Sequence, residues 1–390
     1  MNEFTEWKTL QFKDICRLKS DKVTVDSSDI QTYISTENML PNFGGVQSAK
    51  NIPLTGKLNT FKYGDVLFSN IRTYFKKVWI ATFDGVASPD VLIFSAMKNC
   101  EPQYLYYMMC EPQFTEFTVL TSRGAKMPRG DKEAILNYEI SLPSLAEQKA
   151  IASILASLDN KIDLLHRQNK TLESIAETLF RQCFVDDSNG SGTEVELHEI
   201  IEFNPKRVLS KGSKAMYLEM AGLNTNTFAA SGYYERDFTS GQKFIKQDTL
   251  LARITPCLEN GKAGYVHFLS PEQVGWGSTE FIVLRPKPKF HPLFSYILCR
   301  NNEFKEYAES CMEGSSGRQR VNVSHLSMYT LTLPHDDVIT QFNEILASIE
   351  PKLISNALQI QTLENLRDTL LPKLMSGEVR VNYTPEEIKQ

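Results

Sequence analysis

Two long segments of the chain carry apolar residues at steps that alternate between four and three. This spacing places the apolar side chains on one face of a helix, in a heptad seam. We therefore predict two long helices, at residues 144–185 and 335–380. The first seam consists of Ile151, Leu155, Leu158, Ile162, Leu165, Asn169, Leu172, Ala176, Leu179 and Cys183. The second consists of Phe342, Leu346, Ile349, Leu353, Asn356, Ile360, Leu363, Arg367, Leu370 and Leu374.

The ends of these helices carry further signals. Ser144 and Glu147 have the spacing of a capping box, in which a hydroxyl and a carboxylate satisfy the free amides of a first turn. The second helix contains two prolines, and a proline inside a helix removes a backbone hydrogen bond. We expect a bend or a restart near Ser348–Pro351, and we expect Pro372 to end or redirect the last turn.

The polar seam positions predict how the two helices pair. In an antiparallel register Asn169 faces Asn356, so each buried amide finds the other. An unpaired buried amide costs about 1–3 kcal/mol, and a parallel pairing would leave both amides against leucine or isoleucine. The sequence thus favours an antiparallel pair in which Asn169 and Asn356 set the register. The alternative is that each apolar stripe packs only on its own domain.

The chain is internally duplicated. Asp65 and Asp248 begin similar apolar runs, Tyr33 matches Tyr217, and the Leu-Pro that precedes each long helix recurs, all at offsets of about 183 to 191 residues. Short runs rich in β-branched and aromatic residues, broken by Gly, Pro and Asn, fill both halves. We predict a mixed α/β fold with two duplicated domains and two long antiparallel helices. The expected order is domain one, helix one, linker, domain two and helix two, at 1–143, 144–185, 186–192, 193–334 and 335–380.

Composition narrows the class of protein. The chain has 390 residues, a formal net charge of −5 and seven cysteines. The cysteines are dispersed, with no C-x-x-C pair, which favours free thiols and no metal site. No apolar run is long enough for a membrane span, and the first ten residues lack the core of a signal peptide. We therefore expect a cytoplasmic protein without a membrane partner.

Polar, basic loops precede both long helices. The first occupies residues 122–132 and the second residues 314–322. Glycines let a backbone approach phosphate closely, and Arg, Ser and Gln bind phosphates or base edges. Two such loops at equivalent places favour DNA binding over ordinary solvated loops, although the acidic net charge argues against it unless the cations gather on one face. The candidates here are Arg123, Lys126, Arg129, Ser316, Arg318, Gln319 and Arg320.

Two further groups of residues could contact DNA. One follows the duplicated apolar runs, and the other lies in a loop nearer the start of each domain. Asn and Arg can make bidentate contacts to adenine and guanine, respectively. The first group is Asn70, Arg72, Tyr74, Lys76 and Lys77, with Arg253, Thr255, Asn260 and Lys262 in the second half. The other group is Asn38 and Asn42, with Asn224 in the second half.

The motifs of common nucleotide-dependent enzymes are absent. No Walker phosphate loop occurs, and no G-x-G-x-x-G follows a strand. Asn204-Pro205-Lys206 lacks the second proline and the aromatic residue with which adenine methyltransferases hold a flipped base. No Ser, His and Asp set forms a readable triad. We predict that the chain is not an enzyme.

The chain resembles the specificity subunit of type I restriction-modification systems over nearly its whole length. The residues that carry the resemblance are Leu142-Pro-Ser-Leu-Ala-Glu-Gln148, Gly314-Ser-Ser-Gly-Arg-Gln-Arg-Val-Asn-Val-Ser324 and Leu370-Leu-Pro-Lys-Leu-Met-Ser-Gly-Glu-Val379, together with Gly124-Ala-Lys-Met-Pro128 and Trp7-Lys-Thr-Leu.

The resemblance implies a division of labour. Each domain would be a target recognition domain that reads one half of a split sequence in double-stranded DNA, and the helices would fix the unread gap. The chain itself would use no cofactor. Two modification subunits would bring S-adenosylmethionine, and restriction subunits would bring ATP and Mg. Because the two basic loops differ in length and composition, the two domains would read different sequences.

Two other classes of function are open from the residues alone. The chain could be a coiled-coil adaptor for other proteins without direct DNA reading, which its acidic charge favours and its paired basic loops disfavour. It could also be an enzyme with an unusual site, which turnover by the isolated chain would establish.

Overall fold

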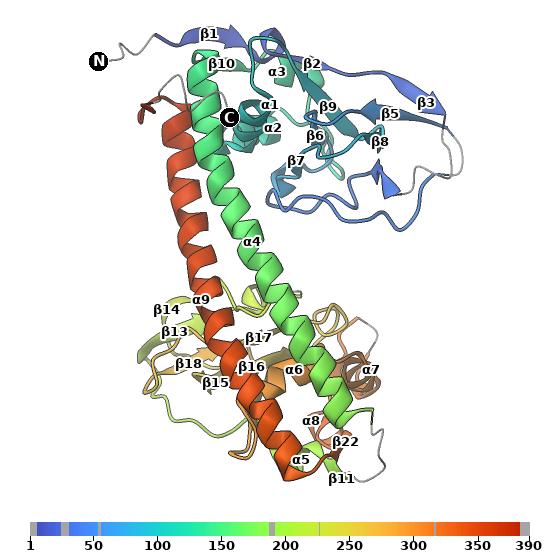
Figure 1. Ribbon diagram of the computed structural model, residues 1–390, viewed down its shortest axis with the longest axis vertical. Helices are drawn as coiled ribbons and strands as arrows, with labels where there is room; N and C mark the ends of the chain where they lie inside the picture. Colours follow the sequence, from blue (N-terminus) through green and yellow to red (C-terminus); the bar gives the residue numbers. More distant parts are fainter. Residues whose placement is uncertain are drawn as a thin grey trace. The chain divides into compact units, whose positions relative to one another are not determined.

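A computed structural model describes residues 6–24, 31–53, 56–186, 192–225, 227–315 and 317–382 (Figure 1). The chain forms two compact units. The first comprises Met1–Lys161 with Leu363–Gln390, and the second Ile162–Thr362. Each unit thus joins one of the predicted domains to a segment of both long helices. The predicted linker 186–192 lies mostly outside the described residues.

The described residues of the first unit form three small sheets and several short helices. Its strands are β1 (Lys8–Gln11), β2 (Cys16–Leu18), β3 (Lys22–Thr24), β4 (Tyr33–Ile34), β5 (Lys57–Phe61), β6 (Val66–Ser69), β7 (Val78–Ile80), β8 (Gly85–Ala87), β9 (Val91–Ala96) and β10 (Glu139–Leu142). Its short helices are η1 (Phe12–Asp14), η3 (Thr73–Phe75), α1 (Pro102–Cys110), α2 (Pro112–Leu120) and α3 (Lys132–Leu136). The strand orders are β1-β10, β2-β9-β6-β7 and β3-β5-β8-β4.

The second unit repeats this plan. Its strands are β11 (Thr193–Glu196), β12 (Ile201–Phe203), β13 (Lys214–Leu218), β14 (Tyr234–Asp237), β15 (Gln242–Ile245), β16 (Thr249–Ala252), β17 (Ala263–Tyr265), β18 (Val274–Gly277), β19 (Phe281–Pro286), β20 (Met312–Glu313), β21 (Arg320–Val321) and β22 (Thr330–Leu333). Its short helices are α5 (Leu197–Ile200), η4 (Met220–Gly222), α6 (Phe294–Arg300), α7 (Asn302–Ser310) and α8 (Val323–Leu326).

The sheets show that the two halves are duplicates. The order β12-β19-β16-β17 matches β2-β9-β6-β7, and β11-β22 matches β1-β10. In the third sheet, the parallel pair β13 and β18 corresponds to β4 and β8, and β15 corresponds to β5. Among the described residues of this sheet the edge strand differs, because β14 joins β13 while β3 joins β5, and the second unit has a further sheet, β20-β21. The duplication predicted from the sequence, and with it the mixed α/β class, is confirmed.

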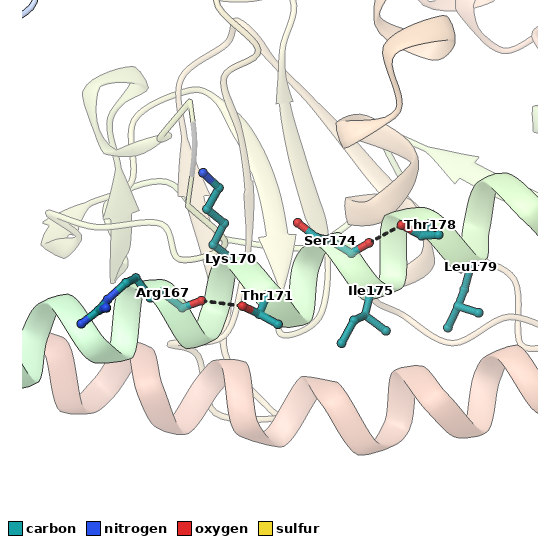
Figure 2. A pocket seen from close by; sticks show the side chains of 7 residues that line it. All are labelled: Arg167, Lys170, Thr171, Ser174, Ile175, Thr178 and Leu179. Carbon is teal, nitrogen blue, oxygen red and sulfur yellow. Dashed lines mark hydrogen bonds between the residues drawn. The ribbon is translucent and has the colours of Figure 1, made fainter. Parts of the chain in front are cut away.

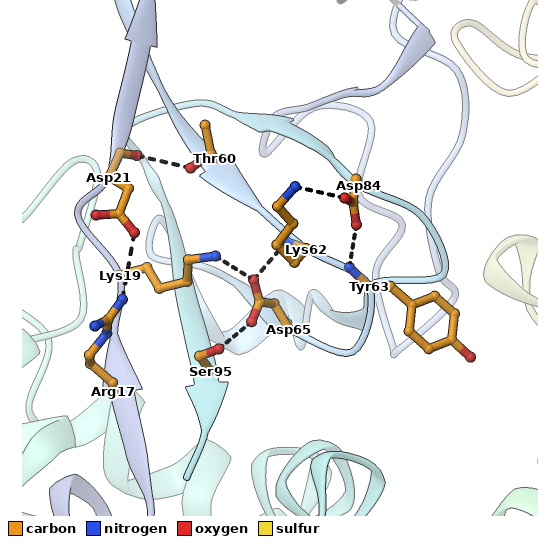
Figure 3. A network of polar contacts seen from close by, with 9 residues as sticks. All are labelled: Arg17, Lys19, Asp21, Thr60, Lys62, Tyr63, Asp65, Asp84 and Ser95. Atoms are coloured by element: carbon orange, nitrogen blue, oxygen red, sulfur yellow. Dashed lines mark hydrogen bonds and ion pairs between the residues drawn. The ribbon is translucent and has the colours of Figure 1, made fainter.

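The buried strands are nearly all apolar, but each half also buries an aspartate at the start of its central strand. Asp65 is 4% exposed and accepts hydrogen bonds from Lys19 Nζ at 2.9 Å and Ser95 Oγ at 2.5 Å (Figure 3). Asp248 is fully buried and binds Arg285 Nε at 2.5 Å. Both carboxylates also accept a backbone N–H three residues upstream, from Lys62 and Ile245. The aspartate fixes the turn that enters the strand, so its recurrence in the sequence reflects structure.

The two long helices are α4 (Leu145–Phe184) and α9 (Asp336–Met375), each of 40 residues (green and red in Figure 1). Ser144 Oγ accepts the N–H of Glu147 at 3.3 Å, which is one of the two hydrogen bonds of the predicted capping box. The Glu147 carboxylate is buried and also binds Arg380 at 2.6 Å and Trp7 Nε1 at 3.2 Å. The C-terminal return of the chain after α9 is therefore tied to the first turn of α4 within the first unit.

The two prolines lie within a continuous helix. α9 does not restart at Pro351, and it continues past Pro372 only to Met375. The bend predicted near Ser348–Pro351 stays a prediction. Pro351 is exposed, as are Ala347 and Ser348 one turn earlier, so the carbonyl that lacks a partner can bind water instead. The helix ends instead through Gly377, whose φ of 76° is the left-handed conformation typical of helix ends.

The helices pack in the predicted antiparallel register. In the second unit Asn356 Nδ2 donates to Asn169 Oδ1 at 2.7 Å, and both residues are buried. In the first unit Arg367 binds Asp159 at 3.1 Å, one residue from the same register. The predicted pairing of Asn169 with Asn356 is confirmed.

The long helices contact their domains as well as each other. Phe180 and Phe184 of α4 pack against Phe294 of α6 and Phe342 of α9. Each unit adds a tyrosine–carboxylate hydrogen bond between domain and helix, from Tyr107 to Asp159 at 2.7 Å and from Tyr265 to Glu350 at 2.6 Å. The alternative, in which each stripe packs only on its own domain, is therefore wrong, although the helices contact the domains as well.

Candidate nucleic-acid interface

In the first unit, two of the predicted loops form one structure. The loop after β6 (residues 70–77) and the basic loop before α3 (residues 122–132) exchange backbone hydrogen bonds. Arg72 N donates to Pro128 O at 2.8 Å, and Gly130 N donates to Asn70 O at 3.1 Å. Within the basic loop, Arg123 and Arg129 pair through both of their backbone amides, at 2.8 and 2.9 Å. Residues about 50 apart in sequence thus share one surface.

Acidic neighbours orient the arginines of this surface. Arg129 binds Asp90, which precedes β9, at 3.1 Å, and Arg123 binds Asp131 at 2.5 Å. The pKa of Asp131 is lowered, most by the hydrogen bond from the backbone amide of Ala134, then by that from Glu133 and by the nearby guanidinium of Arg123. The same carboxylate caps α3. Arg123 and Arg129 remain exposed, so their outer faces are available to a phosphate or a base edge.

The second unit builds the same structure from equivalent positions. Thr255 N donates to Gln319 O at 3.1 Å, and Val321 N donates to Arg253 O at 2.8 Å. Thr255 Oγ1 also accepts the N–H of Gln319 at 3.2 Å. These bonds correspond to those of Arg72 and Gly130 in the first unit, so the loop after the central strand again pairs with the basic loop.

The second unit also repeats the ion pair. Arg320 binds Glu280, the residue before β19, with its Nη2 at 2.7 Å and its Nε at 2.9 Å. This hydrogen bonding raises the pKa of Arg320 and lowers the pKa of Glu280. Glu280 occupies the place of Asp90, and Arg320 that of Arg129. Neither acid was singled out in the sequence, although their shared position before equivalent strands is a signal in the repeat.

In each unit a lysine of the loop after the central strand binds a backbone carbonyl of the candidate loop nearer the start of the domain. Lys77 Nζ donates to Thr36 O at 2.7 Å, and Lys262 Nζ donates to Met220 O at 3.2 Å. Partial burial lowers the pKa of Lys77. In both domains a lysine ammonium holds the early loop against the loop that follows the central strand. These two lysines therefore have a structural role, in addition to any contact with a ligand.

Two predicted asparagines are buried. Asn38 is 4% exposed, and its amide binds the carbonyls of Tyr33 and Gln47 while its oxygen accepts from Ser35. It holds its own loop together and cannot reach a base edge from this position. Asn70 is 5% exposed, and among the described residues its Oδ1 has no hydrogen-bond partner. Because strand β6 carries it inward, Asn70 also lies behind the surface.

The other candidates differ in exposure, and Ser316 lies outside the described residues. Half-buried are Lys76, Lys77, Asn224, Arg253, Thr255, Lys262 and Gln319. Exposed are Asn42, Arg72, Tyr74, Arg123, Lys126, Arg129, Asn260, Arg318 and Arg320. The exposed group is mostly cationic and comes from the paired loops of both units. Sequence reasoning missed Phe75, which lies beside Tyr74 and is 40% exposed.

No group of three His, Cys, Asp or Glu side chains among the described residues could hold a metal ion. Nor does any helix that the structure describes have the length and apolar character needed to cross a bilayer.

Comparison with known proteins gives one consistent result. The chain is 22% identical to the specificity subunit of the type I restriction enzyme HindI of Haemophilus influenzae, over 96% of this chain and all of that protein. It is 20% identical to the MjaVIII specificity subunit of Methanocaldococcus jannaschii, over 96% of this chain and 93% of that protein. The crystal structure of the S subunit of a type I restriction-modification system from M. genitalium covers 98% of both chains, with a TM-score of 0.57 and 18% identity.

A family model matches each half of the chain separately. It is described as the type I restriction modification DNA specificity domain, and it matches residues 5–174 and 191–365. These two matches coincide with the two halves that repeat the same sheets and the same pairs of loops. The chain therefore belongs to the family of type I restriction-modification DNA specificity proteins.

Proposed function

We propose that this chain is the DNA-reading subunit of a type I restriction-modification complex. Each α/β domain reads one half of a bipartite target through its paired loops. The observation that carries the proposal is the repeated interface, in which the loop after the central strand and the basic loop bind each other in both units. Exposed arginines at equivalent positions suit phosphate and guanine contacts.

The net charge of −5 does not conflict with this role, because cations outnumber acids in the basic loop of residues 122–132, which has four cations and one acid. Asp90 and Glu280 orient two of the arginines, so the guanidinium groups are held in place before DNA arrives. Such preorganisation reduces the entropy lost on binding.

The long helices supply the spacing between the half-sites in this proposal. An uninterrupted helix of 40 residues extends about 60 Å at 1.5 Å per residue. The hydrogen bond between Asn169 and Asn356 fixes the register, because a slip would bury both amides against apolar side chains. The unread gap in the target would then follow from helix length.

The helices also offer surfaces for partner subunits. A groove lined by residues of α4 alone contains Arg167, Lys170, Thr171, Ser174, Ile175, Thr178 and Leu179 (Figure 2). Ile175 is 45% exposed there, and Leu358 and Leu366 of α9 are 47% and 44% exposed. Exposed apolar side chains on helices are typical of protein interfaces. We assign them to two modification subunits, with restriction subunits completing the assembly.

Catalysis belongs to those partners in this proposal. The modification subunits would supply S-adenosylmethionine, and the restriction subunits would use ATP and Mg. This chain recognises the target sequence, binds the other subunits and needs no cofactor of its own. The paired loops offer arginines, amides and hydroxyls for recognition, and the proposal requires nothing further of them.

The direct test is to map methylated adenines in DNA exposed to this chain and its modification subunit. The proposal expects methylation within one split sequence. Replacing Arg123, Lys126, Arg318 and Arg320 by Ala should abolish it and reduce the dependence of binding on salt, since each lost phosphate contact lowers the log–log slope by about 0.9. The matched control removes four exposed lysines outside the paired loops: Lys50, Lys57, Lys98 and Lys211.

Unaltered DNA affinity in the quadruple arginine and lysine variant, with normal assembly of the subunits, would instead favour a protein adaptor. The spacing role has its own test. Seven residues inserted after Lys161 in α4 and seven after Thr362 in α9 lengthen both helices by about 10 Å. The gap in the methylated sequence should grow by about three base pairs, and an unchanged gap would rule out the spacing role.

A further inference from the structure

The turn after β6 exposes two neighbouring aromatic rings. Tyr74 is 47% exposed and Phe75 is 40% exposed, with ring centroids 4.8 Å apart and planes inclined by 51°. Phenylalanine has no polar group to compensate for exposure, and side chains of this size are usually buried. Two of them on one short turn, at the candidate DNA surface, indicate that a ligand covers them.

The turn is held firmly by its backbone. Arg72 and Lys76 flank η3 in the left-handed region, with φ of 51° and 53°. Phe75 N donates to Arg72 O, and Phe75 O accepts the N–H of Asn42, each at 2.9 Å. Thr73, at the base of the turn, is 3% exposed. The rings are therefore presented from a fixed support, and their exposure does not come from a loose loop.

The surroundings of the rings are cationic. Lys77 Nζ lies 5.8 Å from the centroid of the Phe75 ring. Arg72 is exposed and bonds through its backbone to the basic loop that carries Lys126 and Arg129. We call Arg72, Lys77, Lys126 and Arg129 the cationic collar. Cations beside exposed aromatic rings suit a polyanion that contains stackable rings. Proteins that kink DNA use this combination, in which apolar side chains enter a base step while Arg and Lys bind the flanking phosphates.

The equivalent turn of the second unit lacks this feature. Cys257 and Leu258 take the places of Tyr74 and Phe75, and Leu258 is only 2% exposed. Glu259, which follows, is exposed and acidic. The rings thus belong to one domain only, although the two loops share the same framework.

We propose that Tyr74 and Phe75 form a wedge that inserts into, or stacks on, a base step in the half-site read by the first domain, while the second domain leaves its half-site stacked. This inference rests on the proposed DNA-reading function. The wedge unstacks one step locally, and the cationic collar holds the phosphates on either side. Sequences whose steps unstack easily would therefore be preferred at that position.

The test uses the full chain assembled with its modification subunit and duplexes that carry the methylated sequence. 2-Aminopurine is placed at successive positions of each half-site, apart from the methylated adenines. The complex should raise the fluorescence at one step of the first half-site and at none of the second. The double variant Tyr74→Ala/Phe75→Ala should lose the signal and bind about 10- to 100-fold more weakly, as expected for the loss of aromatic stacking.

A duplex with an abasic site at the responsive step should restore most of the affinity of the double variant, because the unstacking is already done. Phe75→Trp should retain the signal, since it keeps a ring. Tyr63→Ala is the matched control, because Tyr63 is 75% exposed and lies at the opposite end of β6 (Figure 3). It should change neither quantity.

Full affinity and an unchanged signal in the double variant would overturn the wedge. A loss of assembly with the modification subunit would also overturn it and assign the rings to a protein contact. If the unaltered complex bound no DNA, the proposed function itself would fail, which is a different result from a complex that binds DNA without unstacking it.

Discussion

The recognition loops of the two domains share a framework and differ at their tips. Both use the same backbone bonds between loops, the same lysine-to-carbonyl bond and the same arginine–acid pair. The tips diverge: Tyr74 and Phe75 are exposed in one domain, whereas Cys257 is half-buried and Leu258 is buried in the other. Because a framework that positions side chains tolerates little change, the comparison separates residues that hold the surface from residues that select the sequence.

The largest expected effect concerns the buried aspartates of the framework. The side chain of Lys19 is only 9% exposed, and Asp65→Ala removes the carboxylate that pairs with it. Loss of one partner of a buried pair costs about 3–5 kcal/mol. Asp248→Ala should cost less, because Arg285 is 26% exposed and keeps the carbonyl of Lys246. Hydrogen exchange of the β6 and β16 amides measures both effects, and equal losses would contradict the comparison.

The next largest effect concerns the contacts between α4 and α9, which differ between the two units. In the second unit Asn169→Leu should destabilise the helix pair by about 1–3 kcal/mol, since the fully buried Asn356 amide then keeps only its long contact with Gln168 Oε1 at 3.5 Å. The double variant Asn169→Leu/Asn356→Leu should recover that loss. In the first unit Arg367→Leu should have a smaller effect, because Asp159 is 30% exposed. Thermal unfolding reports the order, and a double variant less stable than the single one would refute the pairing argument.

The N-caps of α2 and α7 differ, and we expect this difference to change stability by about 1 kcal/mol. Asn301 caps α7 by accepting the N–H of Phe304, whereas the equivalent Glu111 makes no such bond at α2. Burial raises the pKa of Glu111 to about 7. A carboxyl group whose pKa is higher in the folded than in the unfolded state stabilises the protein at pH values below its unfolded pKa. This stabilisation is lost as pH rises through the folded pKa of about 7.

Glu111→Asn should therefore stabilise the first unit, by about 1 kcal/mol from the new cap and by more at pH 8 than at pH 4. Unfolding measured at both pH values checks the sign. The reverse exchange, Asn301→Glu, is the control and should destabilise the second unit through loss of the cap, with a weaker dependence on pH because Asn301 is only half-buried.

The smallest effect concerns the acids that orient the arginines. Asp90→Asn and Glu280→Gln each remove a negative charge near the proposed DNA surface, so nonspecific DNA affinity should rise about two- to fivefold at low salt. Specificity should fall, because Arg129 and Arg320 lose their fixed orientation. The change should be greater for Glu280, because its two carboxylate oxygens accept hydrogen bonds from Arg320 at 2.7–3.0 Å, whereas Asp90 accepts from Arg129 through one oxygen at 3.1 and 3.3 Å. Binding isotherms on target and random duplexes would test this.

The sequence alone determined the large-scale organisation. The heptad seams, the offset repeats and the two asparagines predicted both helices, their direction and their register, because helical spacing and the cost of an unpaired buried amide are local and general rules. The basic loops were identified as well, since their composition and equivalent positions do not depend on the fold.

Only the tertiary structure decided which polar residues reach the surface. Asn38 and Asn70 were chosen for their chemistry, but neighbouring strands and loops enclose them. Lys77 and Lys262 bind carbonyls contributed by distant segments, and the acids that orient Arg129 and Arg320 lie about 40 residues away in the chain. A residue type fixes what a side chain can bind, whereas its partners depend on which distant segments the fold brings beside it.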